Sequence, residues 1–201
     1  MTFSPECFIS QNKDHVSTKP IKGTRPISKD SIENKKIIDE LLNSDKDKAE
    51  NLMIVDLLRN DFGRNCKYGS VSVENLFDVE TFSNVHHLVS TVNGTISNNS
   101  DIYCLLKGCF PGGSITGAPK IRAMQIIDEI ECSNRGIYCG SIGYISGNDK
   151  SNLNIAIRTI FADDNTLYFW GGGGIVYDSE VELEYKETLD KVRPLLDLFK
   201  A

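Results

Sequence analysis

The chain has 201 residues, of which 40% are hydrophobic and 25% are charged, a composition that is typical of globular proteins and too apolar for a disordered one. Its net charge of −6 argues against a protein that binds nucleic acid or an anionic membrane through bulk charge. No apolar run approaches the roughly 20 residues of a membrane span, and MTFSPECFIS at the start lacks the features of a signal peptide. We therefore expect a soluble, cytoplasmic protein.

The predicted secondary structure mixes helices and strands. Residues 1–27 contain three prolines and are predicted to be irregular. Apolar residues at helical spacing predict helices near 28–43, 45–60, 100–110, 120–130 and 180–198. Alternating and β-branched residues predict strands within 70–96, 137–145, 153–161 and 167–170. This order, without strict alternation, favours an α+β fold with a largely antiparallel sheet.

The cysteines favour reduced thiols. The six are Cys7, Cys66, Cys104, Cys109, Cys132 and Cys139. No two of them stand at C-x-x-C spacing, and no histidine stands at finger-like spacing, which argues against a zinc site. Because a chain of this size can bury a core without covalent crosslinks, disulfides are not required.

Two pairs of acidic residues stand at helical spacing. Asp47 and Glu50 are three residues apart on one predicted helix, and Glu184 and Glu187 are three apart on another, so each pair shares a face. Four carboxylates from two helices would suit a hard divalent cation such as Mg²⁺. Acidic residues at this spacing also line solvated helix faces, and spacing alone leaves both interpretations open.

Of three further features, two are compatible with anion binding. The glycines at 171–174 allow a close approach of the backbone, either for an anion-binding concavity or for a tight corner. Arg158 falls on the predicted strand 153–161 beside Ala156, which suggests a guanidinium in a polar cavity, with a surface arginine as the alternative. Lys22, in a turn after Pro20, is by its spacing alone a solvated charge.

Taken together, eight short sequence motifs of the chain resemble motifs of chorismate-utilising enzymes. They occur in that family's order: SPECFIS (4–10), PIKGTRP (20–26), DKAENLMIVDLLRNDFGR (47–64), VHHLVSTVNG (85–94), PGGSITGAPK (111–120), RGIYCGSIGY (135–144), NIAIRTI (154–160) and GGGIVYDSEVELEYKETLDK (172–191). The chain looks like the C-terminal catalytic region of anthranilate synthase component I and aminodeoxychorismate synthase component I. The resemblance implies two large, mainly antiparallel sheets packed together with helices outside. It also implies that residues 1–201 are the C-terminal part of a chorismate-binding catalytic domain, N-terminally incomplete, with further strands and another domain upstream.

The resemblance implies that the two acidic pairs form one Mg²⁺ site. Glu50 and Glu187 match the direct ligands of the metal, and Asp47 and Glu184 match carboxylates that hold metal-bound water. In the family the metal binds and neutralises the ring carboxylate of chorismate, which is a Lewis-acid and template role.

The resemblance also implies substrate contacts, at Arg158, Tyr138, Gly172, Gly174, Lys191 and Thr24. Arg158 and Tyr138 match the pair that binds the side-chain carboxylate of chorismate. The two glycines match backbone donors of a glycine loop. Lys191 stands four residues beyond Glu187, on the same helix face, and matches a further contact near the substrate.

Three residues match catalytic groups of the family. His87 matches the histidine beside C4 of the ring, with His86 as a structural neighbour, and Glu6 matches the acid that protonates the departing hydroxyl. Lys22 stands in P-I-K-G-T, as in aminodeoxychorismate synthases, whereas anthranilate synthases usually read P-I-A-G-T. The lysine would attack C2, for which a neutral amine is needed, through desolvation or a nearby cation such as Arg25.

The sequence therefore predicts Mg²⁺-dependent amination of chorismate at C4, with ammonia from a separate glutamine amidotransferase subunit, as a step toward 4-aminobenzoate and folate. The alternatives are anthranilate synthase component I, which releases pyruvate, and an inactive remnant that binds a partner chain. Isochorismate and salicylate synthases are disfavoured, because their motif lacks the lysine at position 22.

Overall fold

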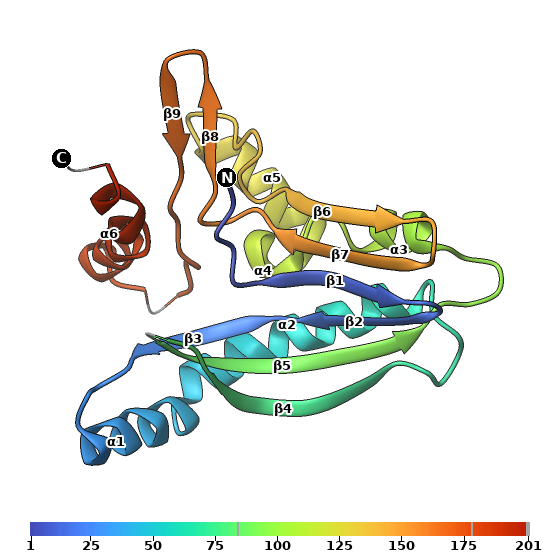
Figure 1. Cartoon of the computed structure of the whole chain (residues 1–201), viewed down its shortest axis with the longest axis horizontal. Helices are drawn as coiled ribbons and strands as arrows, with labels where there is room; N and C mark the ends of the chain where they lie inside the picture. Colours follow the sequence, from blue (N-terminus) through green and yellow to red (C-terminus); the bar gives the residue numbers. More distant parts are fainter. Residues whose placement is uncertain (84, 178, 200–201) are drawn as a thin grey trace.

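The computed structural model describes residues 1–83, 85–177 and 179–199. Seven strands form one antiparallel sheet (Figure 1): β1 (Cys7–Asn12), β2 (His15–Lys19), β3 (Ile21–Pro26), β4 (Ser72–Thr81), β5 (Val85–Thr95), β6 (Ser141–Ser146) and β7 (Lys150–Ile155). A second antiparallel sheet consists of β8 (Ile160–Asp163) and β9 (Thr166–Phe169). The structure thus confirms the α+β class with two antiparallel sheets.

Strand β5 organises the large sheet. The strand order is β3-β5-β2-β1-β7-β6, and β4 pairs with the other edge of β5. β2 and β3 follow one another across Pro20 and share one edge of β5, since Thr18 pairs with Val92 and Ile21 pairs with Val89. This arrangement places β3, which carries Lys22 and Thr24, directly beside His87 of β5.

Six helices accompany the sheets in the described residues: α1 (Ser31–Leu42), α2 (Asp45–Gly63), α3 (Ile102–Cys109), α4 (Gly113–Thr116), α5 (Lys120–Ile130) and α6 (Val181–Asp197). Side chains at the N-caps explain where the first three begin, because Asp30, Ser44 and Asp101 each accept a hydrogen bond from a backbone N–H of the first turn. None of these helices is long and apolar enough to cross a membrane.

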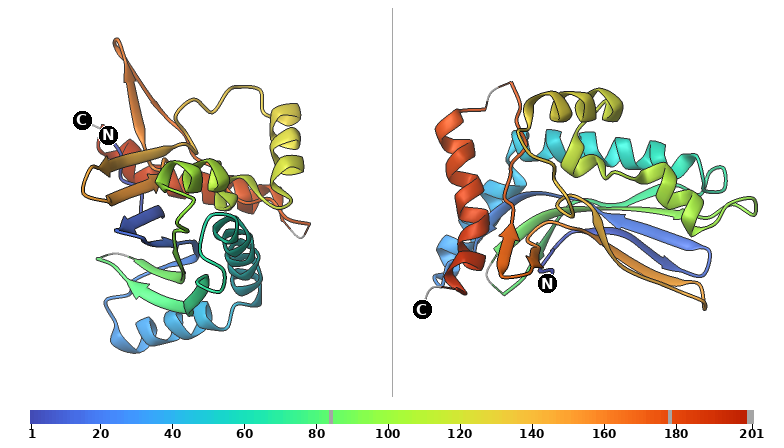
Figure 2. Two further views of the ribbon diagram at one scale, coloured as in Figure 1. Left: turned by 90° about the vertical axis from the view of Figure 1, so that its right-hand side faces the viewer. Right: turned by 90° about the horizontal axis from the view of Figure 1, so that it is seen from above.

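The hydrophobic core lies between the large sheet and the helices on one of its faces (Figure 2). Helix α2 supplies Ile54, Leu58 and Phe62, which pack with residues of β1, β2, β5 and α3 such as Phe8 and Val92. Among the cysteines, all of which are free, Cys66 and Cys109 also belong to this core. One face of α2 is thus fixed against the sheet, and its first turns carry Asp47 and Glu50 toward β3.

The expectation that residues 1–27 are irregular is wrong, because they form strands β1, β2 and β3. The β1–β2 turn, Lys13 and Asp14, contains neither glycine nor asparagine, the residues that most often indicate a tight hairpin turn. Lys13 adopts the left-handed conformation there at φ 59°, so the local sequence does not predict the hairpin. The start of the chain is also paired, since the Met1 amino group donates to the Ile160 carbonyl and Ile160 N–H donates to Met1. These strands depend on partners far away in sequence.

One further expectation needs correction, and one predicted helix has an unexpected exposure. The predicted strand 153–161 is broken: β7 ends at Ile155, β8 begins at Ile160, and Arg158 lies between them with φ 46°. Arg158 therefore does not share a strand face with Ala156. Helix α5 forms as predicted, but its apolar side is not buried, since Ile121 is 72% and Ile130 is 70% exposed.

Candidate active site

Lys22 is the common neighbour of Glu6, Glu50 and Ser114. The Lys22 ammonium donates to the Ser114 carbonyl oxygen at 3.4 Å and stands 4.0 Å from a carboxylate oxygen of Glu50. Glu6 is only 7% exposed. Burial raises the pKa of the Glu6 carboxyl, while a hydrogen bond from Ser114 and the charge of Lys22 oppose this shift. The structure therefore brings the predicted acid, the predicted nucleophile and one predicted metal ligand together.

His87 is held beside this cluster as a neutral ring. Its Nδ1 lies 2.8 Å from the Thr24 hydroxyl oxygen, and its ring meets Phe82 edge to face at 5.4 Å. Burial, assisted by the positive charge of Arg158, lowers the pKa of His87 to about 4. Burial also lowers the pKa of Arg158, so this guanidinium is partly desolvated near His87. Three predicted site residues thus meet although they come from separate segments.

The glycine segment, residues 171–174, passes close to several site side chains. Because a Cβ at these positions would crowd those side chains, glycine suits the segment. A Cβ on Gly172 would stand 2.6 Å from the Tyr138 hydroxyl oxygen, and one on Gly173 would stand 3.1 Å from a carboxylate oxygen of Glu184. The Lys22 nitrogen lies 4.0 Å from the corresponding position on Gly174. Burial raises the pKa of Tyr138, so its hydroxyl keeps its proton and can donate.

Each acidic pair already has polar partners, and Glu184 is the member that lies beside the glycine segment. Arg25 donates to Asp47 at 3.0 Å, and Lys191 pairs with Glu187 at 2.6 Å. Lys191 also donates to the Gly172 carbonyl at 3.2 Å. In the described part of the chain, no three His, Cys, Asp or Glu side chains gather closely enough to hold a metal ion. The carboxylates of α2 and α6 are therefore not assembled around one point in this structure, although carboxylate oxygens are the ligands that Mg²⁺ prefers.

Sequence reasoning missed Ser114 and the partner of Arg25. Ser114 lies in α4 and contacts both Glu6 and Lys22; its string PGGSITGAPK could have drawn attention to it, but only as the start of a helix. Arg25 was expected to act on Lys22 as a neighbouring cation, whereas its guanidinium is paired with Asp47. Neither partner can be read from spacing, since both contacts join different elements.

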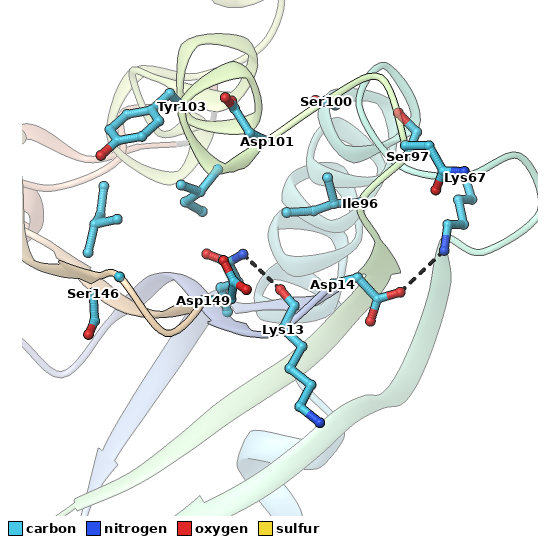
Figure 3. A pocket seen from close by; sticks show the side chains of 15 residues that line it. Lys13, Asp14, Lys67, Ile96, Ser97, Ser100, Asp101, Tyr103, Ser146 and Asp149 are labelled. Carbon is cyan, nitrogen blue, oxygen red and sulfur yellow. Dashed lines mark hydrogen bonds and ion pairs between the residues drawn. The ribbon is translucent and has the colours of Figure 1, made fainter.

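A cavity of about 600 Å³ lies elsewhere, at the end of the sheet that carries the β1–β2 turn (Figure 3). Its lining includes Asp14, which is paired with Lys67, together with Asp101, Tyr103 and Asp149. It contains none of the predicted site residues. Glu6 and Lys22 lie toward the opposite end of these strands, because Cys7 pairs with Lys19 while Asn12 pairs with His15 beside the turn.

Comparison with known proteins gives one family for nearly the whole chain. The family model described as chorismate binding enzyme matches residues 1–197. The chain is 52% identical to aminodeoxychorismate synthase component 1 of Salmonella typhimurium, over 98% of this chain and 43% of that protein. It is 45% identical to anthranilate synthase component 1 of Aquifex aeolicus, over 96% of this chain and 39% of that protein.

A solved structure of a similar protein has the same fold. Anthranilate synthase component I from Streptococcus pneumoniae TIGR4 superposes with a TM-score of 0.86 at 40% identity, over 96% of this chain and 42% of that one. The chain thus spans less than half the length of these relatives. Together with the family match over residues 1–197, these similarities establish that the chain belongs to the chorismate binding enzymes.

Proposed function

We propose that this chain carries the catalytic site of an aminodeoxychorismate synthase component 1. The site would aminate chorismate at C4 in a Mg²⁺-dependent reaction, with ammonia supplied by a glutamine amidotransferase subunit. Residues 1–201 would correspond to the C-terminal part of the catalytic domain. The relatives from Salmonella typhimurium and Escherichia coli that bear this name, at 52% and 51% identity, support the proposal.

The observation that carries the proposal is a lysine beside a buried carboxylic acid. The Lys22 amine would form a bond to C2 of chorismate while the ring double bond shifts and the C4–O bond breaks. Glu6, whose pKa is raised by burial, would give its proton to the departing hydroxyl, which leaves as water. Ammonia would then bond to C4 as the Lys22 amine is expelled, and Glu6 would take back a proton.

The other groups would hold the substrate. Arg158 and the Tyr138 hydroxyl would bind the side-chain carboxylate, with backbone N–H groups of Gly172 and Gly174 as further donors. Neutral His87, held by Thr24, would face C4. Lys191 would contribute from α6 through its contact with Gly172.

A magnesium ion would be held by the two acidic pairs. Glu50 and Glu187 would bind it directly, and Asp47 and Glu184 through water, because hard divalent cations prefer carboxylate and water oxygens. When bound, the ion would neutralise the ring carboxylate of chorismate.

Anthranilate synthesis is the competing function, because two of the relatives reported above carry that name. The residue that favours amination at C4 is Lys22, which donates to the Ser114 carbonyl while the Ser114 side chain contacts Glu6. An anthranilate synthase would need no amine nucleophile at this position. The products separate the two functions, since anthranilate forms with release of pyruvate and aminodeoxychorismate retains the enolpyruvyl group.

The test is product analysis of the purified chain with chorismate, MgCl₂ and ammonium. We expect aminodeoxychorismate, no pyruvate, and loss of turnover after chelation of the metal with EDTA. Lys22→Ala should lower the rate at least about 100-fold, because the covalent route is lost. Lys19→Ala is the matched control, since Lys19 pairs with Glu80 at the surface, and its rate should stay within about twofold.

Three results would contradict the proposal. Undiminished aminodeoxychorismate formation by Lys22→Ala would exclude the covalent role of the lysine. Pyruvate and anthranilate as products would establish the competing function. No turnover of chorismate by the unmodified chain, in the presence of both MgCl₂ and ammonium, would favour the inactive remnant.

A further inference from the structure

Three aromatic rings stack beside the glycine segment. The rings of Tyr138 and Trp170 lie 6.2 Å apart with their planes at 10°, and Tyr168 continues the stack 6.3 Å from Trp170 at 23°. Trp170 directly precedes the four glycines at 171–174. Offset stacks at these separations are attractive beyond the apolar area that they bury. Trp170 therefore links the end of β9 to a side chain in the segment before β6.

Arg135 fixes the other end of this stack. Its guanidinium lies 5.9 Å from the centre of the Tyr138 ring, a cation–π distance. The same guanidinium donates to both carboxylate oxygens of Glu131, at 2.6 to 3.2 Å, and to the Ile115 carbonyl at 2.9 Å. Because Arg135 is anchored to α4 and to the end of α5, the ring that it covers has little freedom to rotate.

The Tyr138 hydroxyl reaches the backbone of Gly172, where a Cβ would come within 2.6 Å of the oxygen. Lys191 holds the carbonyl of the same glycine. A change in the plane of the Tyr138 ring would therefore move both the hydroxyl and the backbone beside it. The ring plane in turn depends on Trp170 and Arg135, which are its neighbours in the stack.

We propose that Trp170 is a positioning residue for substrate binding: its ring sets the plane of Tyr138 and thereby aims the Tyr138 hydroxyl and the backbone of the glycine segment at a carboxylate of the substrate. This role rests on the proposed function, because the carboxylate is that of chorismate. Trp170 acts through Tyr138 and takes no part in the bonds that form and break.

The kinetic test compares Trp170→Leu with Trp170→Phe. We expect Trp170→Leu to raise KM for chorismate about three- to tenfold, the value of one aromatic pair, with kcat within about twofold. Trp170→Phe, which restores a flat ring, should recover most of the loss. Phe161→Leu is the matched control, because Phe161 contacts Tyr168 at the outer end of the stack and should leave KM unchanged.

A second measurement tests the stack without turnover. Trp170→Leu, Tyr138→Leu and the double variant are unfolded in urea, and the three losses of stability are compared. If the rings are coupled, the double variant loses less than the sum of the single variants. Additive losses, or an unchanged KM in Trp170→Leu, would overturn the positioning role while the proposed function stands. A wild-type chain without turnover would refute the proposed function, and the role in substrate binding with it.

Discussion

At the scale of single residues, burial acts in opposite directions on the pKa values of Glu6 and His87, and in each case it favours the neutral form. Removal from water disfavours the charged form, so burial raises the pKa of an acid and lowers that of a base. Burial therefore raises the pKa of the Glu6 carboxyl above its ordinary value, and it lowers the pKa of His87 to about 4, so that the His87 ring is neutral near pH 7. One physical cause thus prepares a proton donor and an uncharged ring within the same site.

The neutral state of His87 predicts how stability depends on pH. In the unfolded chain a histidine titrates near its ordinary pKa of about 6.5, whereas in the folded protein the pKa of His87 is about 4. Between these values the unfolded chain binds more protons, so the free energy of unfolding falls as the pH is lowered. We expect His87 to account for about 1–2 kcal/mol of this loss after allowance for solvent screening.

The measurement is urea unfolding of the wild-type chain and of His87→Asn between pH 7 and pH 4. The variant should lose less stability over this range than the wild type. His15→Asn serves as the control, because His15 is exposed at the start of β2 and its replacement should leave the pH profile unchanged. Parallel profiles for wild type and His87→Asn would refute the assignment of this loss to His87.

At the scale of elements, the half-buried ammonium of Lys120 holds together the two ends of the segment that carries Ser114. The Lys120 ammonium, at the start of α5, donates to Asp61 of α2 at 2.7 Å and to the carbonyl of Cys109, at the end of α3, at 2.8 Å. It thereby fixes both ends of residues 110–119. Since Ser114 in this segment contacts Glu6 and Lys22, Lys120 supports the site without touching it.

Loss of this cation should cost more than loss of a surface ion pair. The side chains of Lys120 and Asp61 are 14% and 4% exposed, so Lys120→Met leaves a buried carboxylate unpaired, at a cost of about 3–5 kcal/mol. Lys67→Met is the control: its pair with Asp14 is 45% and 63% exposed, and its loss should cost less than about 1 kcal/mol.

Adding Asp61→Leu to Lys120→Met removes the unpaired charge and should recover part of the stability. Chemical unfolding of the variants measures these differences. Equal losses in Lys120→Met and Lys67→Met would show that the Lys120 pair behaves as a surface pair and does not close the segment.

Local signals predicted the elements that depend on local causes. Helix α2 follows from its apolar spacing and from the Ser44 cap. The strands in residues 1–27 escaped prediction because β2 and β3 are stabilised by pairing with β5, about 70 residues away. Arg158 was misplaced because its left-handed φ of 46° breaks a strand that its sequence would continue.

The site itself was predictable only through family resemblance. Helical spacing identified each acidic pair, but no local signal indicates that Glu50 of α2 lies beside Lys22 of β3 or that Glu184 of α6 lies beside Gly173. The same holds for Glu6 and Lys22, which meet through Ser114 of α4. Contacts between residues of different elements depend on tertiary packing, which cannot be predicted from the spacing of residues along one helix or strand.

At the scale of the whole molecule, packing is dense on one side and sparse on the other. The core unites α2 and α3 with β1, β2 and β5. Among described residues, α5 contains no buried side chain and α6 contains only Leu195. The hairpin β8–β9 likewise presents Phe161, Leu167 and Tyr168 to solvent. The glycine segment joins this sparse side to the site, so part of the site rests on weakly packed elements.

This difference predicts uneven protection of backbone amides from hydrogen exchange. A two-stranded hairpin is marginally stable in water. Beyond the buried Ile160 and the contact of Tyr168 with Trp170, the side chains of β8–β9 are largely exposed, so the hairpin should open without unfolding of the core. We expect its amides to exchange at least about 100-fold faster than those of Leu88 and Val92 in β5, which are fully buried. Mass spectrometry of peptic fragments from a monomeric sample measures both segments. Equal protection of β8–β9 and β5 in that sample would mean that the hairpin opens only with the core, and that the glycine segment is held as firmly as the large sheet.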